Sequence, residues 1–565
     1  MERTGAELIV ESLKAEGVKV LFGLPGSENL PIMDILYDTP DIRFIQSQHE
    51  QGAIFMANGY AAASRQPAVT LVSPGPGATN CVSGVTQAYY SSIPSILICI
   101  REDSLYSGQG TSQHHDLEAT RVFAPVTKRS IEIQRVERMR EHLQDAFRVA
   151  LADRKGSCFI SIPRNLLVAK TDDQAATHPR FPIPLTRGNA QDIDRAARLL
   201  TGAKRPVILA GGGVIAAEAC QELQELAEFL SAPVGTTAGH NGIIPEDHPL
   251  SVGPCFSSRP LPAAKAFREA DLVLTVGCTF TYFGTGFYNR PGLPLPNGAK
   301  MVQIDSDPAI IDKVYPVDAA VVGDAKLVLQ DLLRSFKENN HAPTRESPWL
   351  KTVLQYKQEW EKETAPLRNS NEVPIRNWRL MSDLRKALPR DAMVGGSGGS
   401  THAWFEHTFQ SLVPNTVGGW NPMGGDFCGA MGAKLAKPDR VVVTVTGDGS
   451  MMMTLPEMAT AVANDIPILC VVRHNRIFGN MRHTQVTRYK GRFSGTDLPI
   501  PNLANIAREF GAYGETVEEP AQIIPAVTRA LESGKPALLD FVVNSSPEEL
   551  MPPEFSIARE REALS

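Results

Sequence analysis

The stretch Arg440-Val-Val-Val-Thr-Val-Thr-Gly-Asp-Gly-Ser450 decides the fold expected for the last third of the chain. Its β-branched run predicts a buried strand, and the Gly-Asp-Gly at its end predicts a sharp turn. Thr454-x-x-Glu457 has the spacing of a capping box, so it predicts the start of a helix that runs to about Asn464. The apolar run at residues 468–472 predicts the next strand. Strand, helix and strand in this order indicate a right-handed crossover unit on a parallel sheet.

Each of these two predicted strands is followed by a polar side chain, Asp448 after the first and Asn475 after the second. Both strand ends of a right-handed crossover open on the same side of the sheet, so we expect the two side chains to lie close together. With a nearby backbone carbonyl they form the oxygen-only shell that Mg²⁺ prefers, and Gly447 and Gly449 let the backbone approach a diphosphate. The alternative interpretation is an ordinary turn and an ordinary loop residue.

A second glycine-rich segment lies in the same block. Val394-Gly-Gly-Ser-Gly-Gly-Ser-Thr401 follows a predicted strand at residues 392–394. Glycines between a strand and a helix cradle phosphate through backbone N–H groups, although such a segment by itself is equally consistent with a flexible turn. Beside the Gly-Asp-Gly motif it strengthens the prediction of a diphosphate site.

The alternation of strands and helices continues upstream and divides the chain into three α/β blocks. The first begins with a helix that has the capping-box pattern Thr4-x-x-Glu7, and a proline-containing linker at about 170–188 follows it. Ser347-Pro348 predicts the N-cap and first turn of a helix between the second and third blocks. We predict domains at residues 1–170, 189–338 and 373–545, and a polar tail at 546–565.

Composition limits the classes of function. The chain has 565 residues, which at about 150 residues per domain predicts three or four domains. A formal net charge of −6 argues against a nucleic-acid binder. We expect no membrane attachment, because no apolar run approaches the roughly 18 residues of a span and the N-terminus lacks the layout of a secretory signal. Eight cysteines without a C-x-x-C pair are typical of reduced thiols, so we expect a cytoplasmic enzyme.

On Gly447-Asp448-Gly449-Ser450 followed by Asn475, the chain resembles the thiamine-diphosphate-dependent superfamily of acetolactate synthase, benzoylformate decarboxylase and pyruvate oxidase. The first block resembles its pyrimidine-binding domain, with Gln48-His49-Glu50 and Ser73-Pro-Gly-Pro-Gly-Ala-Thr-Asn80. The other two blocks resemble its central and diphosphate-binding domains. This resemblance implies an α/β fold of three consecutive doubly wound domains, the cofactors thiamine diphosphate and Mg²⁺, and active sites at the subunit interface of a dimer or tetramer.

The resemblance also implies roles for single residues. Glu50 is expected to bind N1′ of the aminopyrimidine and to drive catalysis. The metal ligands are expected to be Asp448, Asn475 and the carbonyl of Ile477. The Asn421 carbonyl is expected to accept from the 4′-amino group, and Met423 to wedge the cofactor into its bent form. The rest of the predicted cofactor site consists of Pro76, Asn80, Gly399, Ser400, Thr401, Gly447, Gly449, Ser450, Phe478 and Gly479.

The expected substrate is a small 2-oxo acid. His114-His115 resembles the paired histidines of decarboxylases that hold the substrate carboxylate and relay protons, and Ser27 resembles a serine that contacts that carboxylate. The alternative interpretation is that each of these three residues is an ordinary polar residue of a loop. The segment Gly479-Asn-Met-Arg-His-Thr-Gln485 lacks the tryptophan that acetolactate synthases have there, whereas residues 491–498 keep the synthase-like Gly-Arg-Phe-Ser-Gly-Thr-Asp-Leu.

We therefore expect decarboxylation of a 2-oxo acid, with the product protonated to an aldehyde or ligated to a second carbonyl. The alternatives are an acetolactate synthase proper, a flavin-linked 2-oxo acid oxidase and a homologue without catalysis. FAD is doubtful, because Gly211-Gly-Gly213 fits the dinucleotide fingerprint poorly and Cys278-Thr-Phe-Thr-Tyr-Phe replaces the segment of flavin-binding members.

Overall fold

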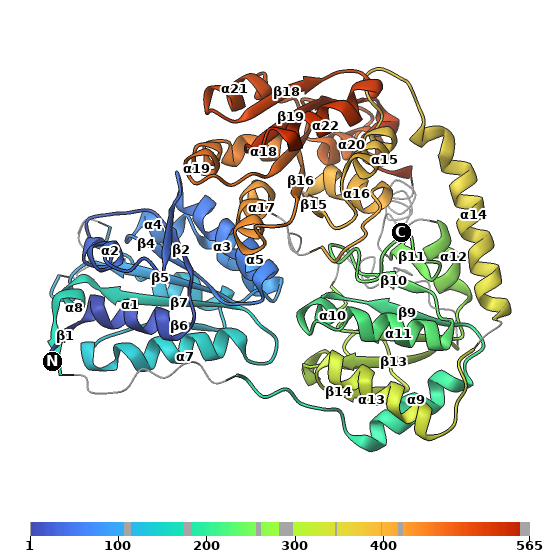
Figure 1. Ribbon diagram of the computed structural model, residues 1–565, viewed down its shortest axis with the longest axis horizontal. Helices are drawn as coiled ribbons and strands as arrows, with labels where there is room; N and C mark the ends of the chain where they lie inside the picture. Colours follow the sequence, from blue (N-terminus) through green and yellow to red (C-terminus); the bar gives the residue numbers. More distant parts are fainter. Residues whose placement is uncertain are drawn as a thin grey trace.

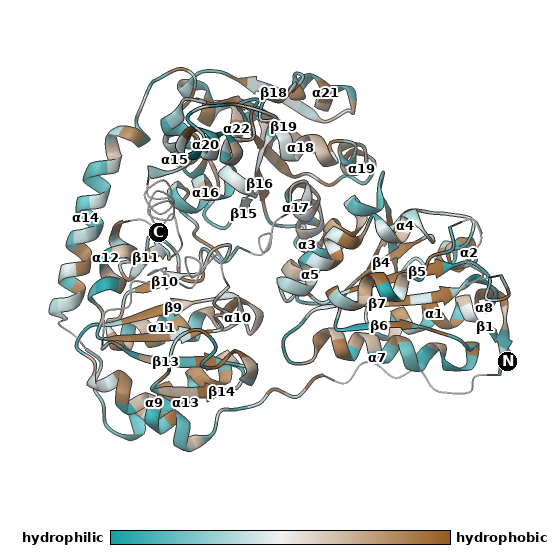
Figure 2. Ribbon diagram, turned by 180° about the vertical axis from the view of Figure 1, so that it is seen from behind, coloured by the Kyte–Doolittle hydropathy of each residue, from teal (hydrophilic) through white to brown (hydrophobic). Residues whose placement is uncertain are grey.

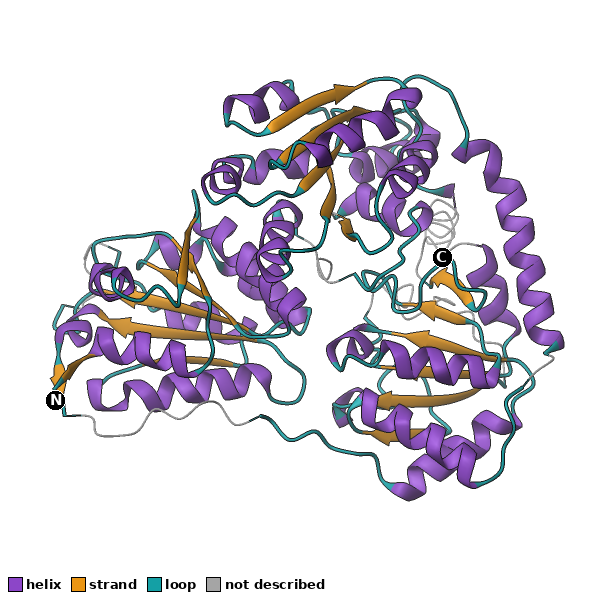
Figure 3. Cartoon of the chain, in the orientation of Figure 1, coloured by secondary structure: helices purple, strands orange, loops and turns teal. Residues whose placement is uncertain are grey.

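The structure is a computed structural model that describes residues 2–106, 115–172, 182–255, 261–281, 298–344, 347–396, 398–415 and 422–553. Three parallel sheets follow one another along the chain, and helices cover both faces of each sheet (Figures 1 and 3). The strands are mostly hydrophobic, whereas the outer helices have a hydrophilic side (Figure 2). This arrangement confirms the predicted fold of three consecutive α/β domains.

The N-terminal sheet has the order β3-β2-β4-β5-β7-β6, and all of its strands are parallel. Because the chain proceeds to β3 on one side of β2 and to β4 on the other, the loops after β2 and β4 diverge at the carboxyl ends of the strands. The strands are β2 (Val20–Gly23), β3 (Arg43–Gln46), β4 (Ala68–Val72), β5 (Ser95–Arg101), β6 (Arg129–Glu132) and β7 (Ser157–Pro163).

Two layers of helices bury the faces of this sheet. Helices α1, α2, α7 and α8 pack on one face, and α3 and α5 pack on the other. Thr4 and Glu7 form the predicted capping box at the start of α1. The helices are α1 (Gly5–Ala15), α2 (Leu30–Tyr37), α3 (Glu50–Ser64), α4 (Pro76–Thr79), α5 (Val82–Tyr90), α6 (Ala119–Phe123), α7 (Met139–Leu151) and α8 (Arg164–Val168), and β1 (Arg3–Thr4) pairs with β8 (Lys170–Thr171).

The central sheet has the order β11-β10-β9-β12-β13-β14, which is the strand order of dinucleotide-binding folds. A Cβ on Gly211 would lie 2.3 Å from the carbonyl oxygen of Gly277, so this glycine is needed for two strand-end turns to pack together. The strands are β9 (Pro206–Ala210), β10 (Val234–Thr236), β11 (Ser251–Pro254), β12 (Leu272–Val276), β13 (Lys300–Asp305) and β14 (Ala319–Val322). The helices are α9 (Ala190–Gly202), α10 (Gly212–Ala216), α11 (Cys220–Leu230), α12 (Leu261–Glu269) and α13 (Ala325–Glu338).

A long helix, α14 (Pro348–Arg368), leads from the central domain to the C-terminal domain along the outside of the molecule (Figure 1). Its predicted N-cap is confirmed, because the hydroxyl of Ser347 accepts a hydrogen bond from the backbone N–H of Leu350 at 3.1 Å. In the described part of the chain, no helix is both long and apolar enough to cross a membrane.

The C-terminal sheet has the order β15-β16-β17-β19-β18, again with parallel strands. The strands are β15 (Met393–Gly396), β16 (Val442–Gly447), β17 (Leu469–His474), β18 (Tyr513–Val517) and β19 (Ala537–Val542). The helices are α15 (Asn377–Ala387), α16 (Gly399–Thr408), α17 (Gly425–Ala436), α18 (Asp448–Thr454), α19 (Glu457–Ala463), α20 (Gly479–Arg488), α21 (Leu503–Glu509) and α22 (Ile523–Glu532).

The predicted capping box at Thr454 and Glu457 is wrong. A helix already begins at Asp448, and Thr454 is its last residue. Both side chains bind elsewhere, because the hydroxyl of Thr454 donates to the carbonyl of Gly424 at 3.0 Å and the carboxylate of Glu457 accepts from a backbone N–H of the N-terminal domain. Tertiary contacts have replaced the local cap.

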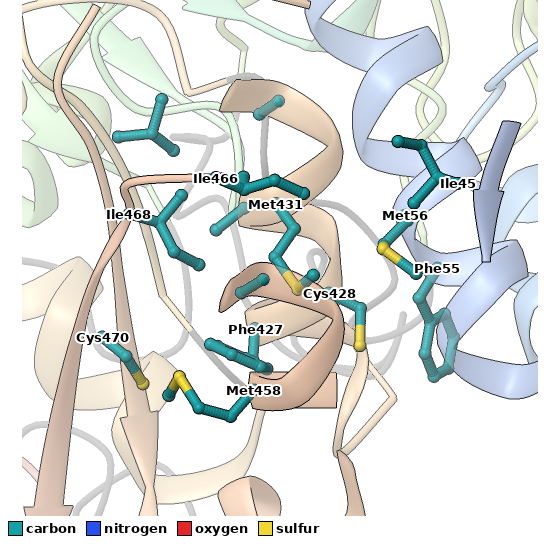
Figure 4. Packing of buried hydrophobic residues seen from close by; sticks show 14 of the residues in the cluster. Ile45, Phe55, Met56, Phe427, Cys428, Met431, Met458, Ile466, Ile468 and Cys470 are labelled. Carbon is teal, nitrogen blue, oxygen red and sulfur yellow. The ribbon is translucent and has the colours of Figure 1, made fainter. Parts of the chain in front are cut away.

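One hydrophobic cluster is shared by the N-terminal and C-terminal domains, with α3 packed on α17 (Figure 4). Phe55 and Met56 of α3 lie beside Cys428 and Met431 of α17 in this cluster. The helices approach closely because they meet at glycines: a Cβ on Gly432 would lie 1.8 Å from the carbonyl oxygen of Met56. The two domains that carry the predicted cofactor residues therefore share a core within one chain.

Candidate active site

The carboxylate of Asp448 lies at the adjoining ends of β16 and β17. Its Oδ2 accepts hydrogen bonds from the backbone N–H of Asn475 at 3.0 Å and of Arg476 at 2.6 Å, and its Oδ1 accepts from the N–H of Gly449 at 2.7 Å. The parallel pairing of the two strands, with Gly447 opposite Arg473, brings the segments together as the crossover argument predicted.

These groups are suited to a cation. Burial raises the pKa of Asp448, while the backbone N–H groups of Arg476 and Gly449 oppose that shift, and a bound cation would reverse it. Asn475 contacts this carboxylate through its backbone N–H, and its side-chain amide oxygen accepts a long, 3.3 Å bond from the N–H of Ile477. The described residues contain no group of three His, Cys, Asp or Glu side chains that could hold a metal alone. A cation here therefore needs oxygen ligands from a phosphate or from water, as Mg²⁺ commonly has.

Two further predicted segments close around the same strand ends. A Cβ on Gly447 would lie 3.1 Å from the hydroxyl of Thr401, and a Cβ on Gly479 would lie 2.7 Å from the hydroxyl of Ser400. Helix α16 begins beside them without a side-chain cap, and Gly399 has a φ of +69°. Its first-turn N–H groups are therefore donors for an anion.

The loop after Asn475 is held by a second chain segment. The N–H of Phe478 donates to the carbonyl of Thr496 at 2.9 Å, and Ile477 forms a β-bridge with Asp497. Gly449 lies under this loop, where a Cβ would be 2.8 Å from Leu498 and would collide with it. The synthase-like segment that the sequence retains thus fixes the position of the expected metal-binding carbonyl.

Ser450 and Met423 lie on the side of the site that faces α17. The hydroxyl of Ser450 donates to Asp426 at 3.0 Å and accepts from the N–H of Gly424 at 2.8 Å, so it ties α18 to the turn before α17. Met423 is half-buried in that turn. Asn421 lies outside the described residues.

Glu50 is the first residue of α3 and belongs to the N-terminal domain. Its carboxylate Oε2 accepts a hydrogen bond from the side-chain amide of Asn80 at 2.9 Å. Asn80 ends the short helix α4, whose first residue, Pro76, is exposed. The sequence therefore predicted two residues, Glu50 and Asn80, that the structure brings into direct contact.

Two of the substrate-contact candidates, Ser27 and His115, lie in loops that follow strands β2 and β5 of the N-terminal sheet. The hydroxyl of Ser27 donates to Glu28 at 2.6 Å, and a Cβ on Gly75 would lie 2.9 Å from the Cβ of His115. Burial raises the pKa of Glu28, but hydrogen bonds, led by those from the hydroxyl of Ser27 and the backbone N–H of Glu28, outweigh it and hold that pKa below its usual value. Sequence reasoning missed Glu28, although it follows Ser27 directly. His114 lies outside the described residues.

Two more residues were missed. Glu457 accepts from the backbone N–H groups of Gln48 at 3.1 Å and His49 at 3.0 Å, so a C-terminal-domain carboxylate holds the start of the helix that carries Glu50. Arg473 is fully buried and donates to the hydroxyl of Thr401 at 2.9 Å. The available signal for Arg473 was a cation at the end of an apolar strand.

Comparison with known families accounts for most of the chain. Residues 3–120 match "Thiamine pyrophosphate enzyme, N-terminal TPP binding domain", residues 193–332 match the central domain of the same family, and residues 397–541 match its C-terminal TPP binding domain. The first match contains Glu50 and its partner Asn80, and the third contains Asp448 and Asn475, which together are the Asp448 cluster. The chain belongs to the thiamine pyrophosphate enzymes.

Relatives within the thiamine pyrophosphate enzymes extend over nearly the whole chain. The "Probable acetolactate synthase large subunit" of Methanocaldococcus jannaschii is 35% identical over 97% of this chain and 93% of its own length. The sulfoacetaldehyde acetyltransferase of Castellaniella defragrans is 31% identical over 94% and 91%. The large subunit of acetolactate synthase isozyme 3 of Escherichia coli is 30% identical over 95% and 94%.

Proposed function

We propose that this thiamine pyrophosphate enzyme catalyses the Mg²⁺-dependent decarboxylation of a small 2-oxo acid, whose product is protonated to an aldehyde or joined to a second carbonyl. The observation that carries the proposal is the meeting of Asp448 and Asn475 at adjoining strand ends, where the starts of α16 and α20 also converge. That arrangement offers oxygen ligands to a metal ion and N–H donors to a diphosphate at one place.

In this proposal Asp448, Asn475 and the Ile477 carbonyl hold Mg²⁺, while Gly399, Ser400 and Thr401 bind the diphosphate. Bound thiamine diphosphate supplies an electron sink for the electrons of the broken carbon–carbon bond. The protein's own contribution is to hold the two ends of the cofactor at fixed positions and to keep water from the bond that breaks.

Glu50 has the second essential role in the proposal. The Asn80 amide fixes one oxygen of its carboxylate, which leaves the other oxygen to share a proton with a ring nitrogen. We further propose that two copies of the chain associate, and that Glu50 of one copy serves the Asp448 cluster of the other. Ser27 and His115, with His114, are the proposed contacts of the 2-oxo acid. His115 lies beside Gly75, and the hydroxyl of Ser27 donates to Glu28. A cytoplasmic location is supported by the eight cysteines, none of which forms a disulfide in the described residues.

The test is a panel of 2-oxo acids assayed for carbon dioxide release with added Mg²⁺ and thiamine diphosphate. Wild-type protein is expected to consume one class of 2-oxo acid, and Glu50→Gln, which keeps the shape and the bond to Asn80, is expected to lose turnover while the cofactor still binds. Rates like wild type in Glu50→Gln would refute the assigned role.

An acetolactate synthase proper is the second candidate, because relatives with that name cover nearly the whole chain. Incubation with pyruvate separates the two: a decarboxylase accumulates acetaldehyde, and a synthase accumulates acetolactate.

A further inference from the structure

Arg473 is a charged side chain in the interior of the C-terminal domain. It is the fifth residue of β17, where the residues before it are apolar, and its side chain is almost completely buried. Burying a guanidinium is costly unless a counter-charge and hydrogen-bond acceptors surround it. The groups around Arg473 therefore show whether the protein itself or a bound ligand neutralises its charge.

Both of its hydrogen-bond partners are neutral. Nε donates to the amide oxygen of Asn377 at 2.7 Å, and Nη1 donates to the hydroxyl of Thr401 at 2.9 Å. Nη2 is buried and has no hydrogen-bond partner among the described residues. The fork thus has an unused donor on the same plane as the nitrogen that contacts Thr401.

The neighbouring carboxylates are already bound. Glu549 accepts from Arg376 at 2.8 Å and from both nitrogens of Asn377, so it touches Arg376 and Asn377 while its charge only partly opposes the lowering of the Arg473 pKa by burial. Asp448 accepts three backbone N–H groups at the expected metal position. Within the described part of the chain, the counter-charge that contacts Arg473 directly is therefore not supplied by the protein.

The bond to Thr401 has a further consequence. Because its oxygen accepts from Arg473, the hydroxyl proton of Thr401 is free to be donated to another group. Thr401 lies in the first turn of α16, beside Gly447, where the uncapped N–H groups are also donors. The orphaned guanidinium nitrogen and the helix N-terminus are two independent features that favour an anion at this position.

We propose that Arg473 anchors the diphosphate group of the cofactor, as its buried counter-charge and as the residue that orients the Thr401 hydroxyl toward it. This inference rests on the proposed function and adds a residue to its site. Arg473 is a positioning residue through Thr401 and a direct ligand through Nη2. The anion class it selects is a diphosphate chelated by Mg²⁺.

The test is calorimetric binding of thiamine diphosphate and, separately, of inorganic diphosphate, each with Mg²⁺, to purified protein freed of cofactor. Arg473→Met, which keeps the length and removes the charge, is expected to weaken both by at least tenfold. Arg473→Lys, which keeps the charge and loses the fork, is expected to weaken them less. Arg140→Met, another nearly buried arginine bound to Glu11 in the N-terminal domain, is the matched control and is expected to bind both like wild type.

A double-mutant cycle with Thr401→Val separates this role from a structural one. If Arg473 acts through Thr401, the double variant is expected to lose less binding free energy for diphosphate than the sum of the losses in the two single variants. Binding of inorganic diphosphate by Arg473→Met within twofold of wild type overturns the inference but leaves the proposed function intact. Failure of wild-type protein to bind thiamine diphosphate overturns the proposed function instead.

Discussion

Glu406→Gln is expected to remove a pH-dependent loss of stability at the junction of the central and C-terminal domains. Glu406 of α16 is 2% exposed, and its Oε1 accepts the backbone N–H of Gly239 at 3.1 Å. Its Oε2 has no partner in the described ranges. Burial raises the pKa of Glu406 to about 8, with help from the nearby charge of Glu246, so the side chain carries a proton at neutral pH.

The magnitude follows from linkage. The pKa of this carboxyl is higher in the folded protein than its usual value of 4.5. Its contribution to the free energy of unfolding is therefore fully present below pH 4.5 and is lost as the pH rises toward 8. Each pH unit in that window costs about 1.4 kcal/mol, so the step from pH 6.5 to pH 8 costs about 2 kcal/mol. Glutamine resembles the protonated acid and still accepts the Gly239 bond, so Glu406→Gln is expected to lack that loss.

The surrounding groups act differently in this window. Burial lowers the pKa of His240 and of His402 to about 4, so both are neutral above pH 6.5 and add stability only as pH rises toward that value. Burial raises the pKa of Glu246 to about 7, with Lys357 opposing it. All of them are present in both proteins, so the difference between wild type and Glu406→Gln reports the ionisation of Glu406 together with its repulsion by Glu246.

The assay is calorimetric Tm at pH 6.5 and pH 8. For an unfolding unit of about 150–250 residues, about 2 kcal/mol corresponds to roughly 4–8 °C, so wild type is expected to lose that much more than Glu406→Gln. Glu338→Gln, at the exposed end of α13, controls for removal of one surface charge. Equal pH slopes in wild type and Glu406→Gln would refute the reasoning.

Three other outcomes are expected. Gly432→Ala places a Cβ 1.8 Å from the Met56 carbonyl and is expected to cost about 1–3 kcal/mol of stability in denaturant unfolding, whereas an unchanged midpoint would contradict the close helix contact. Asp448→Asn is expected to weaken Mg²⁺-dependent cofactor binding by more than about tenfold in calorimetry; retained affinity contradicts the metal role. Co-expressed Glu50→Gln and Asp448→Asn chains are expected to recover about a quarter of wild-type activity, because half of the dimers carry one intact site of two. No recovery contradicts a site shared between chains.

The sequence predicted the sheets and the position of the site where the signal was local. A β-branched run predicts β16, and parallel crossover geometry then places Asp448 beside Asn475 at the strand ends. The start of α14 was also predictable from local sequence, because the hydrogen bond that caps it joins Ser347 to Leu350, only three residues away. Such features need no knowledge of the distant parts of the chain.

Contacts between residues far apart in the sequence could not be predicted in this way. Thr454 and Glu457 have the spacing of a cap, but Glu457 binds the backbone of residues more than 400 positions away. A capping box stabilises a helix by only about 1 kcal/mol, so two backbone donors that need an acceptor at a domain junction outweigh it. The residue types and spacing are those of a capping box, but the backbone N–H groups that bind Glu457 cannot be inferred from the sequence around it.

The same reasoning explains why Arg473 was overlooked and why it matters. A strand that is buried on both faces has a mostly apolar sequence, so a cationic residue within it contradicts that pattern. The residues next to it in the sequence do not explain why it is there. Such a conflict is expected at functional positions, where stability is given up for binding. In β17 the conflict lies at the strand end, next to the Asp448 cluster, and the guanidinium meets only neutral partners. Burial lowers the pKa of Arg473, and the charges of Glu549 and Asp448 offset only part of that shift. An anion bound beside the guanidinium is expected to offset the rest, which makes the affinity for the diphosphate depend on a residue that no motif contains.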